Sequence, residues 1–510
     1  MDMTRTLRGT NGRTKGRWNM ERLNARLKAT VQRPIKVLQF GEGNFLRAFV
    51  DDMIDIANEE TALNAGIVLV KNIALGSLQA FHEQDCLYTV MLRGLRDGQP
   101  VQEERLITSV QDAVDAYDEY EKYAAFAKLA TLQFIVSNTT EAGIVLDESD
   151  RFDLCPPRTY PGKLCKFLFE RAEAFDYAKD KGLIILPVEL IDDNGIQLKR
   201  CVKALAKIWK LGERFEQWLD EACVFTSTLV DRIVTGYPRD EADRQAIWER
   251  LGYEDRLLVT GEPFALWVIE SPKDLSDVLP LPKCGLPVIF TDNQRPYKQR
   301  KVRILNGAHT SFVPAAFQCG YDYVLQGMQD PLIKNFMQHT LYDEVIPTLT
   351  LPKEDLMSFA EAVTGRFENP FIHHALLSIC LNCVSKWRAR CLPSVLGYVE
   401  KTGELPPRLT FSMASMMALY QGGRLDGGKL LCKRNGEEYA LQDDESVLRF
   451  FEQGNNLSPE QLVHDFLSNE AFFGQDLTKI KGFEASVLQS YKDILEKGMR
   501  TAMTERFAHA

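Results

Sequence analysis

The chain has 510 residues, 45% of them hydrophobic and 26% charged, which is typical of a globular protein with two or three domains. Its formal net charge of −10 argues against a general nucleic-acid binder. No apolar run approaches the roughly 18 residues of a membrane-spanning helix, so we expect no membrane partner.

The eleven cysteines are scattered through apolar stretches, without the spacing of a disulfide framework. Because no apolar core follows the basic N-terminus either, we expect reduced thiols and a cytoplasmic location. The CxxC pair, Cys380 and Cys383, has no second pair to complete a zinc site, so we interpret both as core residues.

Residues 1–34 form a basic segment, with nine Lys and Arg against two acidic residues. The simplest interpretation is a basic N-terminal tail with a short helix over residues 20–31. The alternative is a transit peptide, because the segment is rich in Arg and poor in acids.

From residue 35 the chain alternates strands and helices. Residues 35–40 predict a buried strand, 48–59 an amphipathic helix and 66–73 a second strand, with a glycine-containing turn after the first strand. This is the βαβ unit that binds dinucleotides, because glycines let the backbone approach the pyrophosphate and the helix N-terminus favours an anion. The residues expected at the cofactor are Phe40, Gly41, Gly43, Asn44 and Phe45.

Two positions depart from the usual dinucleotide fingerprint. Leu46 stands at the third glycine, and Lys71-Asn72 stand where an acid usually ends the second strand. These residues leave the choice between NAD and NADP open.

The alternation continues with a predicted helix over residues 109–132 and a strand that runs into a polar turn over 133–144. In an open parallel sheet the ligand lies off the carboxyl ends of the strands. We therefore expect the polar turn to face the cofactor, through Ser137, Asn138, Thr139, Thr140 and Glu141. The alternative is an ordinary capped turn.

Further strands are expected over residues 181–191, 222–238 and 257–270, with a helix over 194–211. A proline-rich composition over 271–300 places the domain boundary near 285, so that 35–285 form a Rossmann-type domain and 286–510 a mostly helical one. The expected long helices cover 330–349, 353–367, 369–402 and 409–423. A hairpin over 429–442 turns at Asn435-Gly436.

A Lys, an Asn and a His occur in one apolar stretch, residues 301–317, which predicts a buried helix. Asn306 and His309 share a face, and the flexible stem of Lys301 can swing to the same side. Burial and neighbouring positive charge lower the pKa of a lysine, which makes it usable as an acid or base near neutral pH. The alternative is a helix start with a solvated Lys, a capped Asn and a core His.

Six strings in order carry a resemblance to the mannitol dehydrogenase family of polyol-specific long-chain dehydrogenases, over about residues 30–510. They are QFGEGNFLRAFVDDMID, VSNTTEAG, LVDRIV, EPFALWVIE, KVRILNGAHT and AVTGRFENPFI. Within the family the chain most resembles the hexuronate branch. The resemblance implies an N-terminal Rossmann-type domain, a helical C-terminal domain, an active site in the cleft between them, NAD as the cofactor and no metal.

The resemblance also implies roles for individual residues. Lys301 is the expected acid/base, Asn306 steadies the reacting oxygen, and His309 orients the lysine or a substrate hydroxyl. Asp231 matches an aspartate near the substrate. Mannitol dehydrogenases carry a second Asn donor where this chain has Leu190 beside Glu189, so Glu189 becomes a substrate-site candidate.

A hexuronate also needs a cation for its carboxylate. Lys386 matches a family position that carries Arg in mannitol dehydrogenases, and Arg366 is a second candidate; Arg303, Arg388 and Arg390 are others. The alternative for the basic residues after 385 is a solvated helix end that complements its dipole.

The expected activity is metal-independent, reversible reduction of a keto-hexuronate to its aldonate, tagaturonate to altronate, with NADH. Fructuronate, mannitol and other polyols are the alternative substrates, and a non-catalytic nucleotide-sensing protein is the remote alternative. The expected partner is a small sugar acid; monomer and dimer both remain open.

Overall fold

Six parallel strands form the central sheet of the N-terminal half in the computed structural model, which describes residues 20–96, 98–140 and 142–507. The order is β5-β2-β1-β6-β7-β8. The strands are β1 (Ile35–Phe40), β2 (Gly66–Lys71), β5 (Val110–Asp115), β6 (Phe134–Ser137), β7 (Ile184–Pro187) and β8 (Val224–Phe225). The order reverses between β1 and β6, which confirms the Rossmann-type prediction and places the ligand-binding crevice there.

Helices cover both faces of this sheet because its strands are apolar on both sides. Val37 packs with η1 (Arg47–Asp51) and α2 (Asp52–Glu60). Its neighbour Leu38 points the other way, as expected for a strand, and packs with the opposite helices. These are α5 (Tyr160–Ala174), α6 (Asn194–Ile208) and α7 (Glu213–Glu221).

Two smaller sheets connect this half to the rest of the chain. One has the order β13-β12-β9, from β9 (Ser227–Asp231), β12 (Leu266–Glu270) and β13 (Val288–Thr291). Strand β13 extends it beyond the predicted boundary at 285. The other sheet, β10-β11-β3-β4, comprises β3 (Tyr88–Arg96), β4 (Gln99–Ile107), β10 (Val234–Gly236) and β11 (Val259–Gly261).

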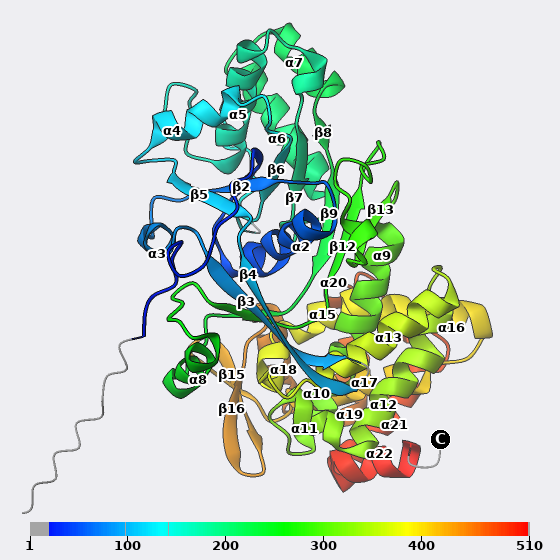
Figure 1. Ribbon diagram of the computed structural model, residues 1–510. Helices are drawn as coiled ribbons and strands as arrows, with labels where there is room; N and C mark the ends of the chain where they lie inside the picture. Colours follow the sequence, from blue (N-terminus) through cyan, green and yellow to red (C-terminus); the bar gives the residue numbers. More distant parts are fainter. Residues whose placement is uncertain (1–19, 97, 141, 508–510) are drawn as a thin grey trace, which may run out of the picture.

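The long hairpin of β3 and β4 reaches from the N-terminal half across to the C-terminal helices (Figure 1). There the Asn369 amide donates a hydrogen bond to the Arg93 carbonyl over 3.2 Å. The hairpin therefore ties the two halves together at a point remote from their covalent connection.

The C-terminal half is helical around α10 (Gly307–Gln318) and α17 (Pro407–Leu419), two largely buried helices in contact. Around them lie α9 (Arg295–Arg300), η5 (Lys301–Asn306), α11 (Val324–Gln329), α12 (Pro331–His339), η6 (Thr340–Val345), α13 (Lys353–Phe367), α14 (Leu376–Ile379), α15 (Cys383–Arg390), α16 (Leu392–Thr402), α18 (Glu445–Gly454), α19 (Pro459–Leu467), α21 (Phe483–Lys497) and α22 (Met499–Phe507).

The predicted hairpin is confirmed as β15 (Lys429–Arg434) and β16 (Glu437–Leu441), joined by β14 (Arg424–Asp426) in a three-stranded sheet. Asn435 and Gly436 have φ values of 53° and 87°, the left-handed conformation that a type I′ turn requires. Cys380 and Cys383 are buried, 1% and 2% exposed, as expected of core residues.

Three predicted helices were wrong in extent. Residues 110–115 form strand β5 instead of helix, because they pair with β2 at the sheet edge, and only α4 (Tyr120–Ala125) and a short 3-10 turn are helical within 109–132. Residues 369–402 are divided into α14, α15 and α16, with Asn382 in a left-handed conformation at the first break.

The third error is the helix predicted over residues 20–31. The Asn24 side chain accepts hydrogen bonds from the backbone N–H groups of Arg26 and Leu27, a local turn that competes with helix. Leu23 is fully buried and bonds through its backbone to Glu254. This part of the predicted tail is therefore packed on the N-terminal half; residues 1–19 lie outside the described residues.

Candidate active site

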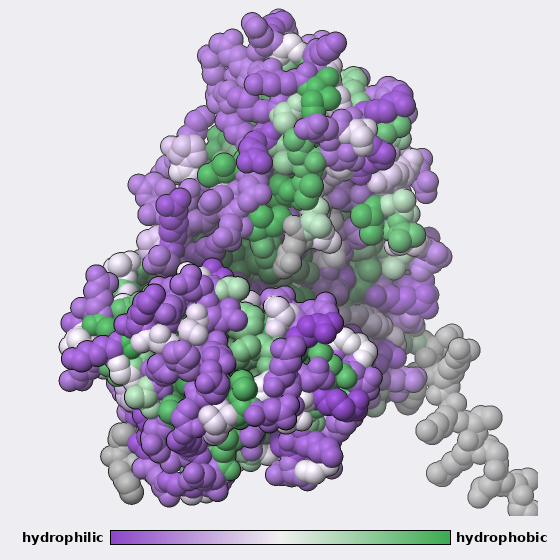
Figure 2. Space-filling model, turned by 180° about the vertical axis from the view of Figure 1, so that it is seen from behind, coloured by the Kyte–Doolittle hydropathy of each residue, from purple (hydrophilic) through white to green (hydrophobic). Residues whose placement is uncertain are grey.

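A cavity of about 710 Å³ opens between the carboxyl ends of β7 and β9 and the start of the helical half. From behind, the surface is hollowed between the upper and lower lobes, and apolar side chains lie along the hollow (Figure 2). The polar residues that line the cavity are Glu189, Asp192, Asp193, Thr228, Gln294, Arg295, Lys298, Gln299, Lys301, Arg303, Asn306 and Arg390.

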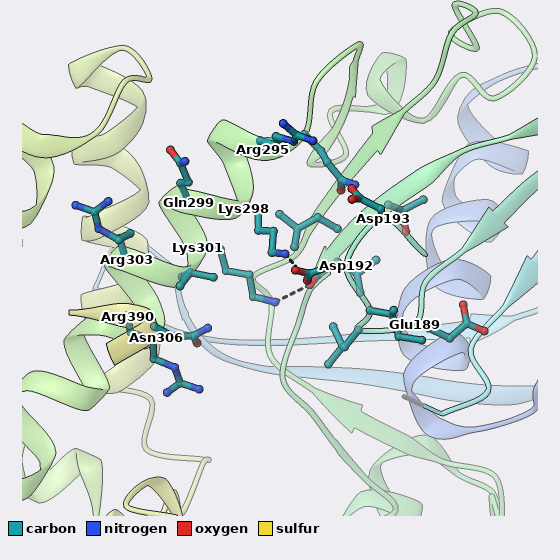
Figure 3. Close-up of a pocket in the computed structure, with 18 of the residues that line it drawn as sticks. Glu189, Asp192, Asp193, Arg295, Lys298, Gln299, Lys301, Arg303, Asn306 and Arg390 are labelled. Atoms are coloured by element: carbon teal, nitrogen blue, oxygen red, sulfur yellow. Dashed lines mark hydrogen bonds and ion pairs between the residues drawn. The ribbon is translucent and has the colours of Figure 1, made fainter. Parts of the chain in front are cut away.

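Lys301 projects into this cavity from η5, a π-helical turn that continues α9 into α10 (Figure 3). Its amine donates a hydrogen bond to the Val230 carbonyl over 2.7 Å, and lies 3.8 Å from the Asp231 carboxylate. The side chain is only 15% exposed. Burial lowers the pKa of Lys301, and the negative charge of Asp231 partly offsets this. The neutral amine is therefore accessible at a lower pH than in a solvated lysine.

Asn306 shares the cavity with Lys301, whereas His309 lies behind its wall. The His309 ring stacks on Phe367 at a centroid distance of 4.2 Å and meets the edge of His374 at 5.2 Å. Burial, together with nearby positive charge, holds the pKa of His309 well below its usual range, so the ring is neutral. Its Nε2 atom is buried and has no hydrogen-bond partner among the described residues.

Asp231 and Arg366, both predicted at the substrate, form a buried ion-pair network with Glu262. The Arg366 guanidinium donates two hydrogen bonds to Asp231, of 3.0 and 2.9 Å, and two to Glu262, of 3.0 and 2.8 Å. The three side chains are 4%, 6% and 1% exposed. Because two carboxylates already satisfy Arg366, it has little capacity left to bind a third; the network instead joins α13 to the N-terminal half.

Glu189 lines the cavity, but its carboxylate points away from Lys301 (Figure 3). It accepts hydrogen bonds from the Ser137 hydroxyl and from the Thr139 backbone N–H and hydroxyl, each 3.1 Å long. Ser137 is fully buried. This contact joins the carboxyl ends of β6 and β7, so the two chain segments that flank the expected cofactor site are held together.

Leu190 follows on the cavity wall and is 64% exposed, so this position provides no second amide donor. The nearby amide is Asn194, which sequence reasoning missed. It is fully buried and donates to the carbonyls of Pro187, Glu189 and Thr228 while accepting from the Thr228 N–H. In the sequence, Asn194 was recognisable only as an Asn at the start of the helix after β7. Its hydrogen bonds hold the end of β7 against β9, which stabilises the cavity wall.

Among the cations proposed for a substrate carboxylate, Lys386 does not line the cavity. Its amine donates to the Ile379 carbonyl over 3.0 Å, and burial lowers its pKa. Arg303 does line the cavity, but its guanidinium is directed to the hydroxyls of Ser394 and Thr348. Arg390, from the last turn of α15, is on the cavity wall beside Asn306 (Figure 3).

The turn after β1 has the geometry of a dinucleotide site. Gly41 has φ of +118°, and a Cβ there would lie 3.2 Å from the Asn138 carbonyl oxygen, so glycine lets the β1 and β6 ends approach closely. Gly43 caps the helix that starts at Asn44, and nothing lies within 4 Å of where its Cβ would be. The turn therefore offers open backbone at a helix N-terminus, as a phosphate requires.

Other predicted cofactor residues have structural partners. Phe40 is buried against Tyr123 and Tyr160, and Phe45 stacks on Phe49 at 4.9 Å. The side-chain amide oxygen of Asn44 accepts a 2.7 Å hydrogen bond from the Arg47 guanidinium. Thr140 is exposed, and Glu141 lies outside the described residues. The backbone N–H groups of Gly41 and Asn138 donate to the carbonyls of Val70 and Phe40. The open backbone at Gly43 and the exposed Thr140 are therefore the parts of the prediction that can face a ligand.

In the part of the chain that the structure describes, no group of three or more His, Cys, Asp and Glu residues lies close enough to hold a metal ion. Within the same residues, no helix is long and apolar enough to cross a membrane.

The parallel sheet, the glycine turn at its switch point and a buried lysine in a cavity between two halves define a two-part protein of the Rossmann class. Comparison with known proteins gives the family. The mannitol dehydrogenase Rossmann domain matches residues 35–283, and the mannitol dehydrogenase C-terminal domain matches residues 293–495. The chain belongs to the mannitol dehydrogenase family.

Two curated relatives extend over almost the whole chain. An altronate oxidoreductase of Escherichia coli O7:K1 is 47% identical over 491 residues, 95% of this chain and 99% of the relative. An altronate oxidoreductase of Yersinia enterocolitica is 46% identical over the same shares.

Solved structures share the fold at lower identity. Pseudomonas fluorescens mannitol 2-dehydrogenase, in a ternary complex with NAD and D-mannitol, is 22% identical with a TM-score of 0.65, covering 94% of this chain and 95% of that one. A substrate-free D-sorbitol dehydrogenase is 21% identical with a TM-score of 0.76, covering 94% and 100%. At these identities the likeness supports the fold alone.

Proposed function

We propose that this protein is an NAD-dependent oxidoreductase that interconverts tagaturonate and altronate, with Lys301 as the general acid–base. The observation that carries the proposal is a buried, hydrogen-bonded lysine in the cavity of a chain that is 47% identical, end to end, to an altronate oxidoreductase. The lysine and the amide in the cavity support an oxidoreductase, and the name of the relative supports the substrate.

Reduction of a ketone builds negative charge on its oxygen, which needs a proton and a hydrogen-bond donor. When bound, the nicotinamide supplies the hydride. The Lys301 ammonium gives the proton in the reducing direction, and its neutral amine takes the proton from the alcohol in the oxidising direction. The Asn306 amide, in the same cavity, is the donor that steadies the oxygen.

The surroundings of Lys301 suit both directions of proton transfer. The Val230 carbonyl fixes the amine on the strand side of the cavity, so the remaining N–H positions or the lone pair can face the substrate. Burial favours the neutral form and Asp231 favours the ammonium. Because these effects oppose each other, neither form becomes inaccessible.

We propose NAD rather than NADP because Lys71 is not available to a 2′-phosphate. Lys71 ends β2, where a cofactor's adenosine ribose is normally recognised. Its side chain is 4% exposed, pairs with Asp115 at 2.6 Å and also donates to the carbonyls of Ala74 and Gly76. Asp115 ends β5 and lines a cavity of about 630 Å³, together with Asp118 and Glu119. A phosphate dianion there would meet carboxylates.

The cofactor proposal is tested by binding, independently of turnover. Titration of the protein with NADH and NADPH, followed by cofactor fluorescence, should show clearly tighter binding of NADH. Asp115→Asn should reduce the ratio of the NADPH to the NADH dissociation constant by about tenfold, which corresponds to roughly 1.4 kcal/mol. The reason is that the substitution removes a negative charge and releases Lys71. Equal affinities in the unsubstituted protein would contradict the proposal.

The substrate proposal is tested by NADH oxidation at 340 nm with tagaturonate, fructuronate and fructose as separate substrates. We expect the highest kcat/KM with tagaturonate. Preference for fructuronate or fructose would assign the chain to one of the alternative activities, and binding of NADH without turnover of any would refute the enzymatic proposal.

A further inference from the structure

The cations at the cavity differ sharply in what they already bind. We infer that Arg390 holds the carboxylate of the substrate, in place of the predicted Lys386 and Arg366. This inference rests on the proposed function, since it concerns a substrate that carries a carboxylate at the end of its carbon chain remote from the ketone.

Elimination among the basic residues of the cavity comes first. Lys301 is assigned to the proton, and the rim residue Lys298 is ion-paired with Asp192. Arg303 is directed to two hydroxyls in the helical half, and Arg295 is exposed at the mouth. What remains is Arg390.

Arg390 is a cation without an anion. Within the described part of the chain, its guanidinium makes one hydrogen bond, from Nη1 to the Thr310 hydroxyl over 3.2 Å. Among the described residues, no carboxylate lies within ion-pairing distance of its guanidinium, whereas Arg366 has two. Arg390 is half-buried. A partly buried charge without a partner is unfavourable, so an anionic ligand that completes the pair would be stabilised there.

The local charge is positive, which favours an incoming anion. After burial, the pKa of His309 is lowered by His374 and by the positive charges of Arg366, Arg390 and Lys386. Burial and Lys386 also lower the pKa of His374, so the lasting positive charge comes from the other three residues. Arg366 is neutralised by its two carboxylates, and the Lys386 amine is turned to a backbone carbonyl. Of these cations, Arg390 is therefore the one that lines the cavity and has no partner anion among the described residues.

A glycine brings this guanidinium beside the reaction centre. Gly307 follows Asn306, and a Cβ at Gly307 would lie 3.3 Å from the Arg390 carbonyl oxygen. The end of α15 can therefore pack directly against the junction of η5 and α10. Figure 3 shows the side chains of Arg390 and Asn306 on the same wall of the cavity. The strand that carries Val230, the carbonyl to which the Lys301 amine donates, lies across the cavity from them. The spacing suits one small molecule that meets both.

Arginine fits this task by its shape as well as its charge. A guanidinium presents two parallel N–H groups that match the two oxygens of a carboxylate, and lysine cannot reproduce that geometry. Toward the residues that the structure describes, Arg390 uses a single N–H group, so a bidentate pair with a ligand remains open.

The test compares an acid with its uncharged counterpart. Inhibition constants of altronate and of altritol, the alditol without the carboxylate, are measured during tagaturonate reduction in the unsubstituted protein and in Arg390→Gln and Arg390→Lys. In Arg390→Gln we expect the inhibition constant of altronate and the KM of tagaturonate to rise about 30- to 1,000-fold. The inhibition constant of altritol should change less than about threefold. Arg390→Lys should recover part of the loss.

Two controls separate the possible failures. Lys298→Met removes a cation of the same cavity, one that is already paired with a carboxylate. It should change the inhibition constants of altronate and altritol less than about threefold. NADH affinity should be unchanged in every variant. Equal weakening of altronate and altritol, or no weakening of altronate in Arg390→Gln, would overturn the inference. Absence of tagaturonate turnover in the unsubstituted protein would instead refute the proposed function.

Discussion

Replacing Arg366 by Met should cost the protein about 3–5 kcal/mol of folding stability. The substitution keeps an unbranched apolar stem and removes four hydrogen bonds of 2.8–3.0 Å to Asp231 and Glu262. It leaves the Glu262 carboxylate, 1% exposed, without a cation, and the Asp231 carboxylate, 6% exposed, with only the Lys301 amine 3.8 Å away. Most of the cost is the desolvation of these poorly compensated charges rather than the loss of the bonds themselves.

The matched control is Arg93→Met. Arg93 also makes two hydrogen bonds to one carboxylate, at 3.2 Å each to Asp243, but the two side chains are 18% and 38% exposed. Solvent therefore screens the pair, and we expect less than about 1 kcal/mol. Urea denaturation of both variants at pH 7 measures the difference. If Arg366→Met costs no more than Arg93→Met, the network does not clamp the two halves.

Three further variants probe the proton chemistry and the buried acids. Lys301→Met should lose about 10²–10⁴-fold in kcat with NADH affinity unchanged, measured by 340 nm assay and fluorescence titration; near-normal turnover would disprove its role. Asp231→Asn removes the charge that raises the pKa of Lys301, so the rate of reduction, which needs the ammonium, should fall at lower pH than in the unsubstituted protein. Burial raises the pKa of Asp51 to about 7, so from about pH 5 to 7 the folded state holds a proton that the unfolded chain has lost, and stability falls as pH rises. Asp51→Asn should reduce this slope by up to about 1.4 kcal/mol per pH unit in urea midpoints taken at pH 5, 6 and 7.

The sequence predicts the Rossmann half well because its strands are short apolar runs with clear ends. β1 begins and ends at the predicted residues, and its burial on both faces follows from its composition. β5 was mistaken for helix because its polar positions, Gln111 and Asp112, fall at an exposed sheet edge, where the alternation of a strand is easily confused with an amphipathic helix.

The sequence likewise indicates some of the candidate site residues, whereas others depend on contacts that only the structure shows. Chemistry and spacing made Lys301 and Asn306 candidates, the family resemblance gave them roles, and the structure places both on the cavity wall. The state of Arg366 could not, since its partners Asp231 and Glu262 are more than a hundred residues away in the chain. Likewise, spacing alone gives no preference between Lys386 and Arg390 on one short helix; the difference is which of them meets the cavity.

The π-helical turn at η5 joins the stability of the molecule to its chemistry. Lys301 belongs to the helical half, but its amine is positioned by the Val230 carbonyl at the end of β9, in the N-terminal half. The next residue, Asp231, is the one that Arg366 clamps from α13. Any displacement of the halves that lengthens the Arg366 bonds therefore also moves the carbonyl that orients Lys301, the proposed proton donor. Loss of the clamp should consequently reduce kcat even where the protein remains folded.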